Sequence, residues 1–221
     1  MQRLLNRKLA DGAKPQTVRN IHACLRRALA QGVRWGVTLR NVATLVDLPR
    51  VDRDDVAALS PADARAVVEA VRGDRLEAVV TVTLATGLRQ GEALGLRWQD
   101  VGLDERVIHV RHALQRMGGT VQLVEPKTKR SKRTVAFPPS AVTVLREHRK
   151  RQLQERLWAG SRWQEGDNVF TSTIGTPMTG ADVTRRFQAL LAAAGLPRMR
   201  FHDLATGQRV SCLHRASRHE S

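Results

Sequence analysis

The stretch ATGLRQGEALGLRWQD, residues 85–100, holds the densest set of structural signals in this sequence. Gly87 is expected to end one helix, and a second short helix is expected to place Arg89 in its first turn, with Glu92 one turn further on. A cation at a helix start is disfavoured, since the positive end of the helix dipole prefers anions. A phosphate bound by Arg89 and the free amides would explain the arrangement. Taken alone, however, the stretch favours a solvated i, i+3 ion pair.

Outward from this stretch, residues 60–204 read as mainly helical. Ser60, Pro61 and Asp63 form a helix start with a capping box, and an apolar helix is expected over residues 75–85. Three β-rich runs follow: VIHV (107–110), VQLV (121–124) and RTVAF (133–137). Gly118 and Gly119 are expected to form a turn between the first two runs. Helical patterns return over residues 140–158 and 181–194. The predicted fold class is mainly α with a small antiparallel β-sheet (α+β).

Residues 1–47 predict a separate helical piece. Pro15 suits the first turn of a helix, and apolar side chains recur at steps of three and four after it. Beside this apolar stripe lies a basic face made by Arg19, Arg26 and Arg27. A polar, proline-containing linker is expected over residues 48–59.

The charge of the chain points to a polyanionic partner. Its 221 residues contain 37 Lys and Arg against 21 Asp and Glu, a formal net charge of +16 with a pI near 11.5. Nucleic acid is the partner that such a charge favours. The two cysteines are too few for a disulfide scaffold or a zinc site, and neither a signal peptide nor a membrane-spanning run is recognised, so the expected location is the cytoplasm. The sequence contains no tyrosine.

Two further passages carry candidate functional residues. EPKTKRSKR, residues 125–133, predicts a hairpin whose basic side chains reach a DNA groove or backbone: Lys127, Lys129, Arg130, Lys132 and Arg133. A solvated charge run is the alternative. In RMRFHDL, residues 198–204, His202 is a candidate for acid–base chemistry, with a packed histidine as the alternative.

The order and spacing of these passages resemble the tyrosine recombinase (phage integrase) family. TGLR with Glu three residues later, a basic β-hairpin, and H-D-L about 110 residues beyond the Arg cover most of residues 60–204. The resemblance implies an integrase-like catalytic domain fragment, preceded in residues 1–47 by part of a helical core-binding (SAM-like) domain that clamps DNA. In that family, arginines, a lysine and a histidine surround a phosphate that a tyrosine attacks, and no metal or nucleotide cofactor is used.

By that resemblance, Arg89 is the first phosphate-binding arginine, and Glu92 is the acidic residue that stabilises the site from the side away from the phosphate. Lys127 protonates the leaving oxygen, and His202 is the first histidine of the site. Ala205 stands where the H-x-x-R motif has its second arginine, and the tyrosine nucleophile is absent. Residues 205–221 read as an aberrant tail, which suggests a shifted reading frame and a truncated pseudogene product.

The predicted function is DNA binding by an integrase, for DNA integration and recombination, in a chain that is itself expected to be inactive in strand transfer. We also expect apolar surface around Val79, Val82 and Leu190 to lack the helices that cover it in the family. The expected partners are double-stranded DNA and a full-length integrase, with no membrane and no small-molecule substrate. Two alternatives stay open: a catalytically dead regulator that occupies attachment sites, and a helical DNA-binding transcription factor.

Overall fold

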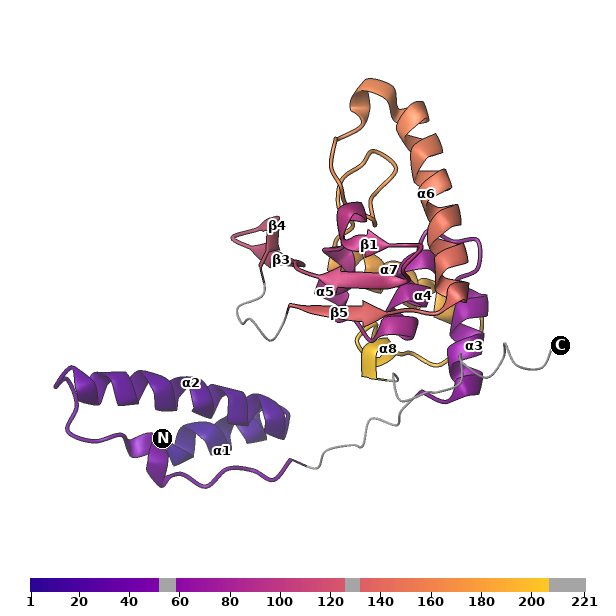
Figure 1. Cartoon of the computed structure of the whole chain (residues 1–221). Coiled ribbons are helices and arrows are strands. Elements are labelled where there is room, and N and C mark those ends of the chain that lie inside the picture. Colours follow the sequence, from indigo (N-terminus) through magenta and orange to yellow (C-terminus); the bar gives the residue numbers. More distant parts are fainter. Residues whose placement is uncertain (52–58, 126–131, 207–221) are drawn as a thin grey trace. The chain divides into compact units, whose positions relative to one another are not determined.

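The computed structural model describes residues 1–51, 59–125 and 132–206. The chain forms two compact units, residues 1–55 and 56–221, and the division lies inside the segment 48–59 that the sequence predicts as a linker (Figure 1). No helix in the described ranges combines the length and the apolar character needed to cross a bilayer.

The first unit consists of helices, as predicted. α1 spans Gln2–Ala10, α2 spans Pro15–Arg34, and a short 3-10 helix follows over Val42–Leu45. Buried Val18 on α2 belongs to the predicted apolar stripe. His22, also on α2, is buried and shares a 2.7 Å hydrogen bond with the carbonyl oxygen of Ala43, which ties α2 to the 3-10 helix.

The second unit is mainly helical. Its helices are α3 (Pro61–Ala70), α4 (Glu77–Thr86), α5 (Gln90–Leu94), α6 (Pro139–Ala159), α7 (Gly180–Ala193) and α8 (Asp203–Thr206). Short 3-10 helices lie at Trp98–Asp100 and Gly160–Arg162. The predicted capping box of α3 is confirmed: the Ser60 hydroxyl accepts from the Asp63 amide at 3.1 Å, and the Asp63 carboxylate accepts from the Ser60 amide at 3.3 Å.

The β-rich runs form two sheets rather than the one that the sequence predicts. β1 (Val101–Gly102), β2 (Val107–Val110) and β5 (Arg133–Ala136) make an antiparallel sheet in the order β1-β2-β5, while β3 (Ala113–Met117) and β4 (Thr120–Val124) pair separately. Because β2 already has a partner on each side, VQLV cannot lie beside it. The turn at Gly118 and Gly119 therefore joins β3 to β4.

The basic connection is also placed differently from the prediction. Residues 126–131, which lie outside the described residues, connect β4 of one sheet to β5 of the other, so they do not join two paired strands. The hairpin predicted for this segment is wrong in that respect. The α+β fold class itself is confirmed.

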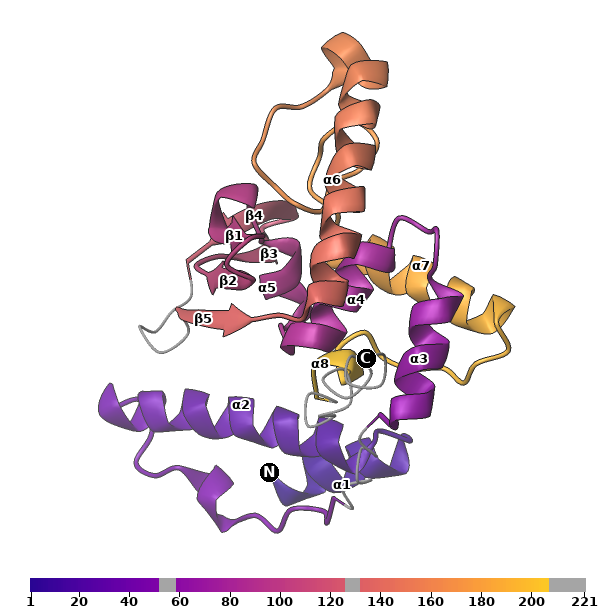
Figure 2. The ribbon, with the colours of Figure 1, turned by 45° about the vertical axis from the view of Figure 1, so that its right-hand side comes forward.

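The core of the second unit forms around α4, as the apolar character of that helix predicts. Val79 and Val82 are fully buried, because α4 packs against α3, α5, α6 and α8 (Figure 2). The expectation of uncovered surface around these valines is therefore wrong, and Leu190 on α7 is itself partly buried. α8, whose four residues end the described part of the chain, contributes to covering this side of α4.

Candidate functional site

Arg89 occupies the N-cap of α5, one residue before the position that the sequence predicts. Gly87 ends α4 with a left-handed backbone (φ 63°), and buried Leu88 then anchors the turn between the two helices. This anchoring directs the Arg89 side chain outward, where 69% of it is exposed. A guanidinium at this place lies beside the free amides of a helix start, where an anion is favoured.

Glu92 is the fixed centre of the site. Its carboxylate is 7% exposed and accepts from the Arg89 amide at 2.9 Å and from Arg89 Nη1 at 3.2 Å. Arg133, the first residue of β5, adds a two-pronged contact from Nη1 at 3.0 Å and Nη2 at 2.9 Å. One buried carboxylate therefore joins the start of α5 to the edge of the three-stranded sheet.

The two arginines keep Glu92 ionised. Burial by itself raises the pKa of the Glu92 carboxyl, but the hydrogen bonds from Arg133 and from the Arg89 amide, with the charges of both guanidinium groups, outweigh burial and lower that pKa below its ordinary value. Both terminal nitrogens of the Arg133 guanidinium are engaged by this carboxylate. Arg89 keeps further N–H donors that contact no other described residue, so it is the cation of this cluster that an anion can reach.

A cavity of about 590 Å³ lies next to this cluster. Gln90 lines it and donates to the Gly180 carbonyl oxygen at 3.2 Å and to Thr184 Oγ1 at 3.1 Å, which fixes α5 against α7. On the other side the cavity is lined by residues 198–203, which include His202. His202 is exposed, whereas its neighbour Phe201 is buried against Phe187 with ring centroids 5.6 Å apart. The packed side chain of this passage is the phenylalanine, and the histidine faces the cavity.

The other predicted DNA-contacting residues have varied placements. Lys127, Lys129 and Arg130 lie outside the described residues. Lys132 is exposed and pairs with Glu125 at 2.8 Å. Arg133 was expected to project toward DNA with them, but its guanidinium is engaged with Glu92 and only 34% of the side chain is exposed.

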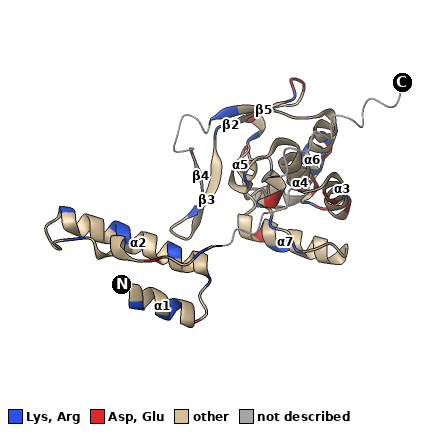
Figure 3. Cartoon of the chain, turned by 90° about the horizontal axis from the view of Figure 1, so that it is seen from below, with Lys and Arg blue, Asp and Glu red and all other residues tan. Residues whose placement is uncertain are grey.

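In the first unit, Arg19, Arg26 and Arg27 line one hollow of about 550 Å³ along α2, whose Lys and Arg residues Figure 3 shows in blue. Arg19 also donates to the Pro49 carbonyl oxygen at 3.2 Å, so the segment that leaves this unit runs beside the basic face. The three arginines thus share a surface, as the helical spacing predicts.

The sequence predicts Arg133 as a DNA-contacting residue but not its pair with Glu92, and it does not predict Gln90 as part of the site. Arg133 was read within a charge run, although it also begins the strand pattern RTVAF, in which alternate side chains face the protein. That alternation was the available signal. Gln90 gives no comparable signal in the sequence. Across the described residues, no group of three or more His, Cys, Asp and Glu is arranged to hold a metal ion.

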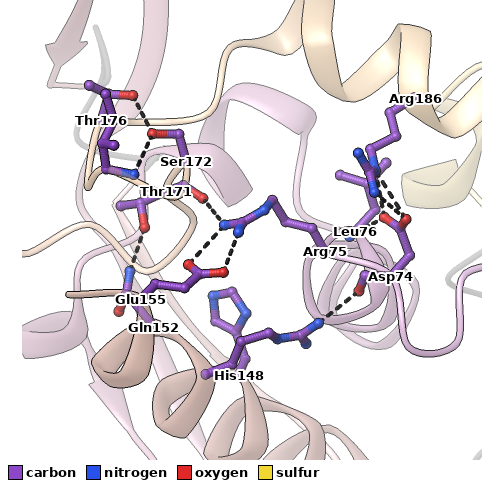
Figure 4. Close-up of polar contacts among 12 residues, drawn as sticks. Asp74, Arg75, Leu76, His148, Gln152, Glu155, Thr171, Ser172, Thr176 and Arg186 are labelled. Carbon is purple, nitrogen blue, oxygen red and sulfur yellow. Dashed lines mark hydrogen bonds and ion pairs between the residues drawn. The ribbon is translucent and has the colours of Figure 1, made fainter. Parts of the chain in front are cut away.

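A second polar cluster is centred on Asp74 and Arg75 (Figure 4). Arg75 donates to the Glu155 carboxylate on α6 and to the Thr171 carbonyl oxygen at 2.8 Å, and 20% of its side chain is exposed. Next to it, Asp74 accepts from Arg186 of α7 at 2.6 Å and from the Leu76 amide at 2.9 Å. This cluster fastens the turn that precedes α4 to α6 and α7.

Comparison with known proteins finds recombinases and integrases among the relatives of this chain. The tyrosine recombinase XerC-like protein of Caldanaerobacter subterraneus subsp. tengcongensis is 29% identical over 92% of this chain and 57% of its own length. The integrase of Streptomyces ambofaciens is 34% identical over 87% of this chain and 52% of its own length. The chain thus spans a little more than half the length of these relatives.

Solved structures show the same fold. The Tn1549 transposon integrase in complex with a circular intermediate DNA superposes with a TM-score of 0.80 at 21% identity, over 94% of this chain and 69% of that one. A lambda integrase dimer bound to a COC′ core site gives 0.63 at 17% identity, over 92% and 68%.

The model of the phage integrase family matches residues 50–215, which reach eleven residues into the segment predicted as an aberrant tail. This match covers all the elements that form the Arg89 cluster and the cavity beside it. The chain belongs to the phage integrase family.

Proposed function

We propose that this chain binds duplex DNA at a backbone phosphate held by Arg89, and that it derives from enzymes of DNA integration and recombination. The observation that carries the proposal is the exposed Arg89 guanidinium, fixed at a helix start by the buried Glu92–Arg133 pair. A phosphate at this place gains charge-assisted hydrogen bonds from a cation whose position is already set. Relatives named integrases and integrase structures solved with DNA support this assignment.

The resemblance to the family supplies roles for the other residues. Lys127 is proposed to protonate the leaving oxygen, and His202, which faces the cavity beside α5, to assist the same transfer. Arg19, Arg26 and Arg27 are proposed to contact DNA from the first unit, and Lys129, Arg130 and Lys132 from the segment before β5. The proposed location is the cytoplasm, because the proposed partner is DNA.

We further propose that these 221 residues by themselves hold DNA without breaking it. Covalent strand transfer in the family needs a tyrosine nucleophile, and this sequence has none; Ala205 also replaces the second phosphate-binding arginine. A regulator that occupies attachment sites beside a full-length integrase would use the same binding without cleavage. Family membership favours such a recombinase-derived role over a helical transcription factor.

DNA binding is tested by measuring the affinity of the chain for a labelled duplex as the salt concentration rises. Each phosphate contact steepens the slope of log K against log salt by about 0.9. The slope for the Arg89→Ala variant is expected to be shallower by about one phosphate contact. Arg162→Ala, which removes an equal charge at the end of an exposed 3-10 helix, is expected to retain the slope. Salt-independent affinity, or equal slopes for both variants, would contradict the proposal.

The absence of strand transfer is tested with a nicked duplex that traps covalent intermediates. The 221-residue chain is expected to give no slow-migrating labelled species on a denaturing gel under conditions where the duplex is bound. A covalent adduct would show that another side chain acts as nucleophile, and this part of the proposal would then be wrong.

A further inference from the structure

The β3–β4 ribbon is an excursion from the main sheet. β2 and β5 are antiparallel neighbours, and Val110 at the end of β2 lies opposite Arg133 at the start of β5. A turn of two residues can join strands in this relation, yet here the connection runs from residue 111 to residue 132. Among the described residues of this connection, β3 and β4 pair only with each other, as a ribbon separate from the three-stranded sheet (Figure 1).

The base of the ribbon is seated on the helix that carries the candidate site. A Cβ atom on Gly91 would lie 2.9 Å from the Leu114 carbonyl oxygen, and one on Gly95 would lie 2.9 Å from the Ala113 Cα atom. The backbone of β3 is therefore in direct contact with α5 and its C-cap, two and six residues after Arg89. This contact holds the ribbon at a fixed place next to the proposed phosphate site.

A buried carboxylate fixes the same base from its other side. Asp100 is 1% exposed and accepts from Arg97 Nε at 3.1 Å. The two residues between β2 and β3 surround it, with Arg111 Nη1 at 3.5 Å and His112 Nδ1 at 3.8 Å. The chain is thus anchored by charge at the point where it leaves the sheet, which is unlike a loop that merely connects two strands.

The outer half of the ribbon presents polar and basic side chains to solvent together with three apolar ones, Met117, Val121 and Leu123. Gln115 lies opposite Gln122, and both are exposed. Arg116 next to them is exposed, and residues 111–124 contain no Asp or Glu. Gly118 and Gly119, with φ of 56° and 87°, close the ribbon in a two-residue turn that keeps its tip narrow.

We propose that the β3–β4 ribbon enters a groove of the duplex next to the phosphate bound by Arg89, and that Gln115 and Gln122 read base edges there. A two-stranded ribbon fits the major groove of DNA, and glutamine can make paired hydrogen bonds to adenine. The absence of carboxylates and the charge of Arg116 favour a polyanion as the occupant. The inference rests on the proposed DNA binding, which it extends to the choice of sequence.

The test selects sequences from a randomised duplex library with the wild-type chain and with the double variant Gln115→Ala, Gln122→Ala. The wild type is expected to enrich particular base pairs, and the double variant to lose that preference by about 5- to 150-fold at the positions read, with its salt slope unchanged. The matched control is the double variant Gln154→Ala, Gln164→Ala, which truncates two exposed glutamines outside the ribbon. Arg116→Ala is expected to weaken binding for all sequences.

The outcomes separate the two proposals. If the wild type binds no duplex, the proposed function fails and the ribbon inference fails with it. If the wild type binds but enriches nothing, or if the ribbon variant retains the preferences of the control, only the ribbon inference is overturned. If the ribbon variant loses self-association and not base preference, the ribbon contacts a second copy of the chain, through surface that includes the exposed Met117 and Val121. That result also overturns the ribbon inference.

Discussion

Two clusters in the second unit, one around Glu92 and one around Arg75, combine arginines with carboxylates in different ways. In the Glu92 cluster, two arginines share one buried carboxylate, and Arg89 remains 69% exposed. In the Arg75 cluster, the arginine is 20% exposed and binds both a carboxylate and a carbonyl oxygen. An excess of cation over anion leaves hydrogen-bond donors for a ligand, whereas a balanced pair uses them within the fold.

The difference teaches that the number of partners, rather than the residue type, separates a binding arginine from a structural one. Both clusters connect elements far apart in the sequence, and both hold a carboxyl pKa low: for Asp74, as for Glu92, burial raises the pKa but hydrogen bonds from arginine and backbone lower it further. Of Arg89 and Arg75, only Arg89 presents donors outward. Four predictions test or sharpen this distinction.

The largest effect is expected for Glu92→Ala. Removing the carboxylate leaves Arg133 part-buried without its partner, and breaking a buried pair in this way costs about 3–5 kcal/mol of unfolding free energy. Chemical denaturation measures it. As the control, Glu69→Ala removes a carboxylate whose pair with Arg72 is exposed and should change stability by at most about 1 kcal/mol. Equal losses in the two variants would contradict a central role for Glu92.

Substituting each cluster's arginine should separate stability from binding. Arg75→Ala is expected to lower the unfolding free energy by about 2–3 kcal/mol, because Glu155 is left largely buried, with DNA affinity of the folded protein unchanged. Arg89→Ala is expected to lose DNA affinity and at most about 1 kcal/mol of stability. If Arg75→Ala weakened DNA binding as much as Arg89→Ala, the distinction between the clusters would fail.

Acid should weaken both clusters together. Since the folded pKa values of Glu92 and Asp74 lie below their ordinary values of 4.5 and 3.8, the stability they contribute is complete above about pH 5 and is lost as the pH falls through the folded values. Denaturation as a function of pH measures this loss. The Glu92→Gln variant should show a shallower decline between pH 5 and the acid limit than the wild type, and an identical decline would count against an ionised Glu92.

The smallest effect on stability is expected for Lys132→Ala. Both side chains of its pair with Glu125 are at least half exposed, so thermal unfolding should stay within the error of measurement. The salt slope for DNA should nevertheless fall by up to one phosphate contact, because Lys132 is free to exchange its partner. If Lys132→Ala lowered thermal stability and left the salt slope for DNA unchanged, Lys132 would have a structural role and not a DNA-binding one.

Local signals predicted much of the fold. Ser60 with Asp63 fixed the start of α3, Gly87 marked the end of α4, and the i, i+3 relation of Arg89 and Glu92 placed their side chains in contact. These features depend on a few neighbouring residues. The proximity of His202 to α5 depends instead on the packing of α7, which no spacing along the chain reveals.

Pairing between distant segments was harder to predict. VIHV, VQLV and RTVAF have similar compositions, so their β propensity indicates strands but does not say which strands are neighbours. Charged residues are subject to the same limit. Because Arg133 lies in a basic run, its sequence context predicts an exposed side chain, and only the pairing of β5 with β2 directs that side chain toward Glu92.

The excursion between β2 and β5 has a consequence for how this fold changes over evolutionary time. Because Val110 and Arg133 already face each other across the sheet, a lineage can lengthen, shorten or remove the intervening segment without altering the register of the strands that carry it. Gly91 and Gly95 are constrained only while a backbone lies against them. Loss of the ribbon should therefore release both glycines to other small residues, so the two features should be gained and lost together, and a transplanted ribbon should need both glycines in its new host.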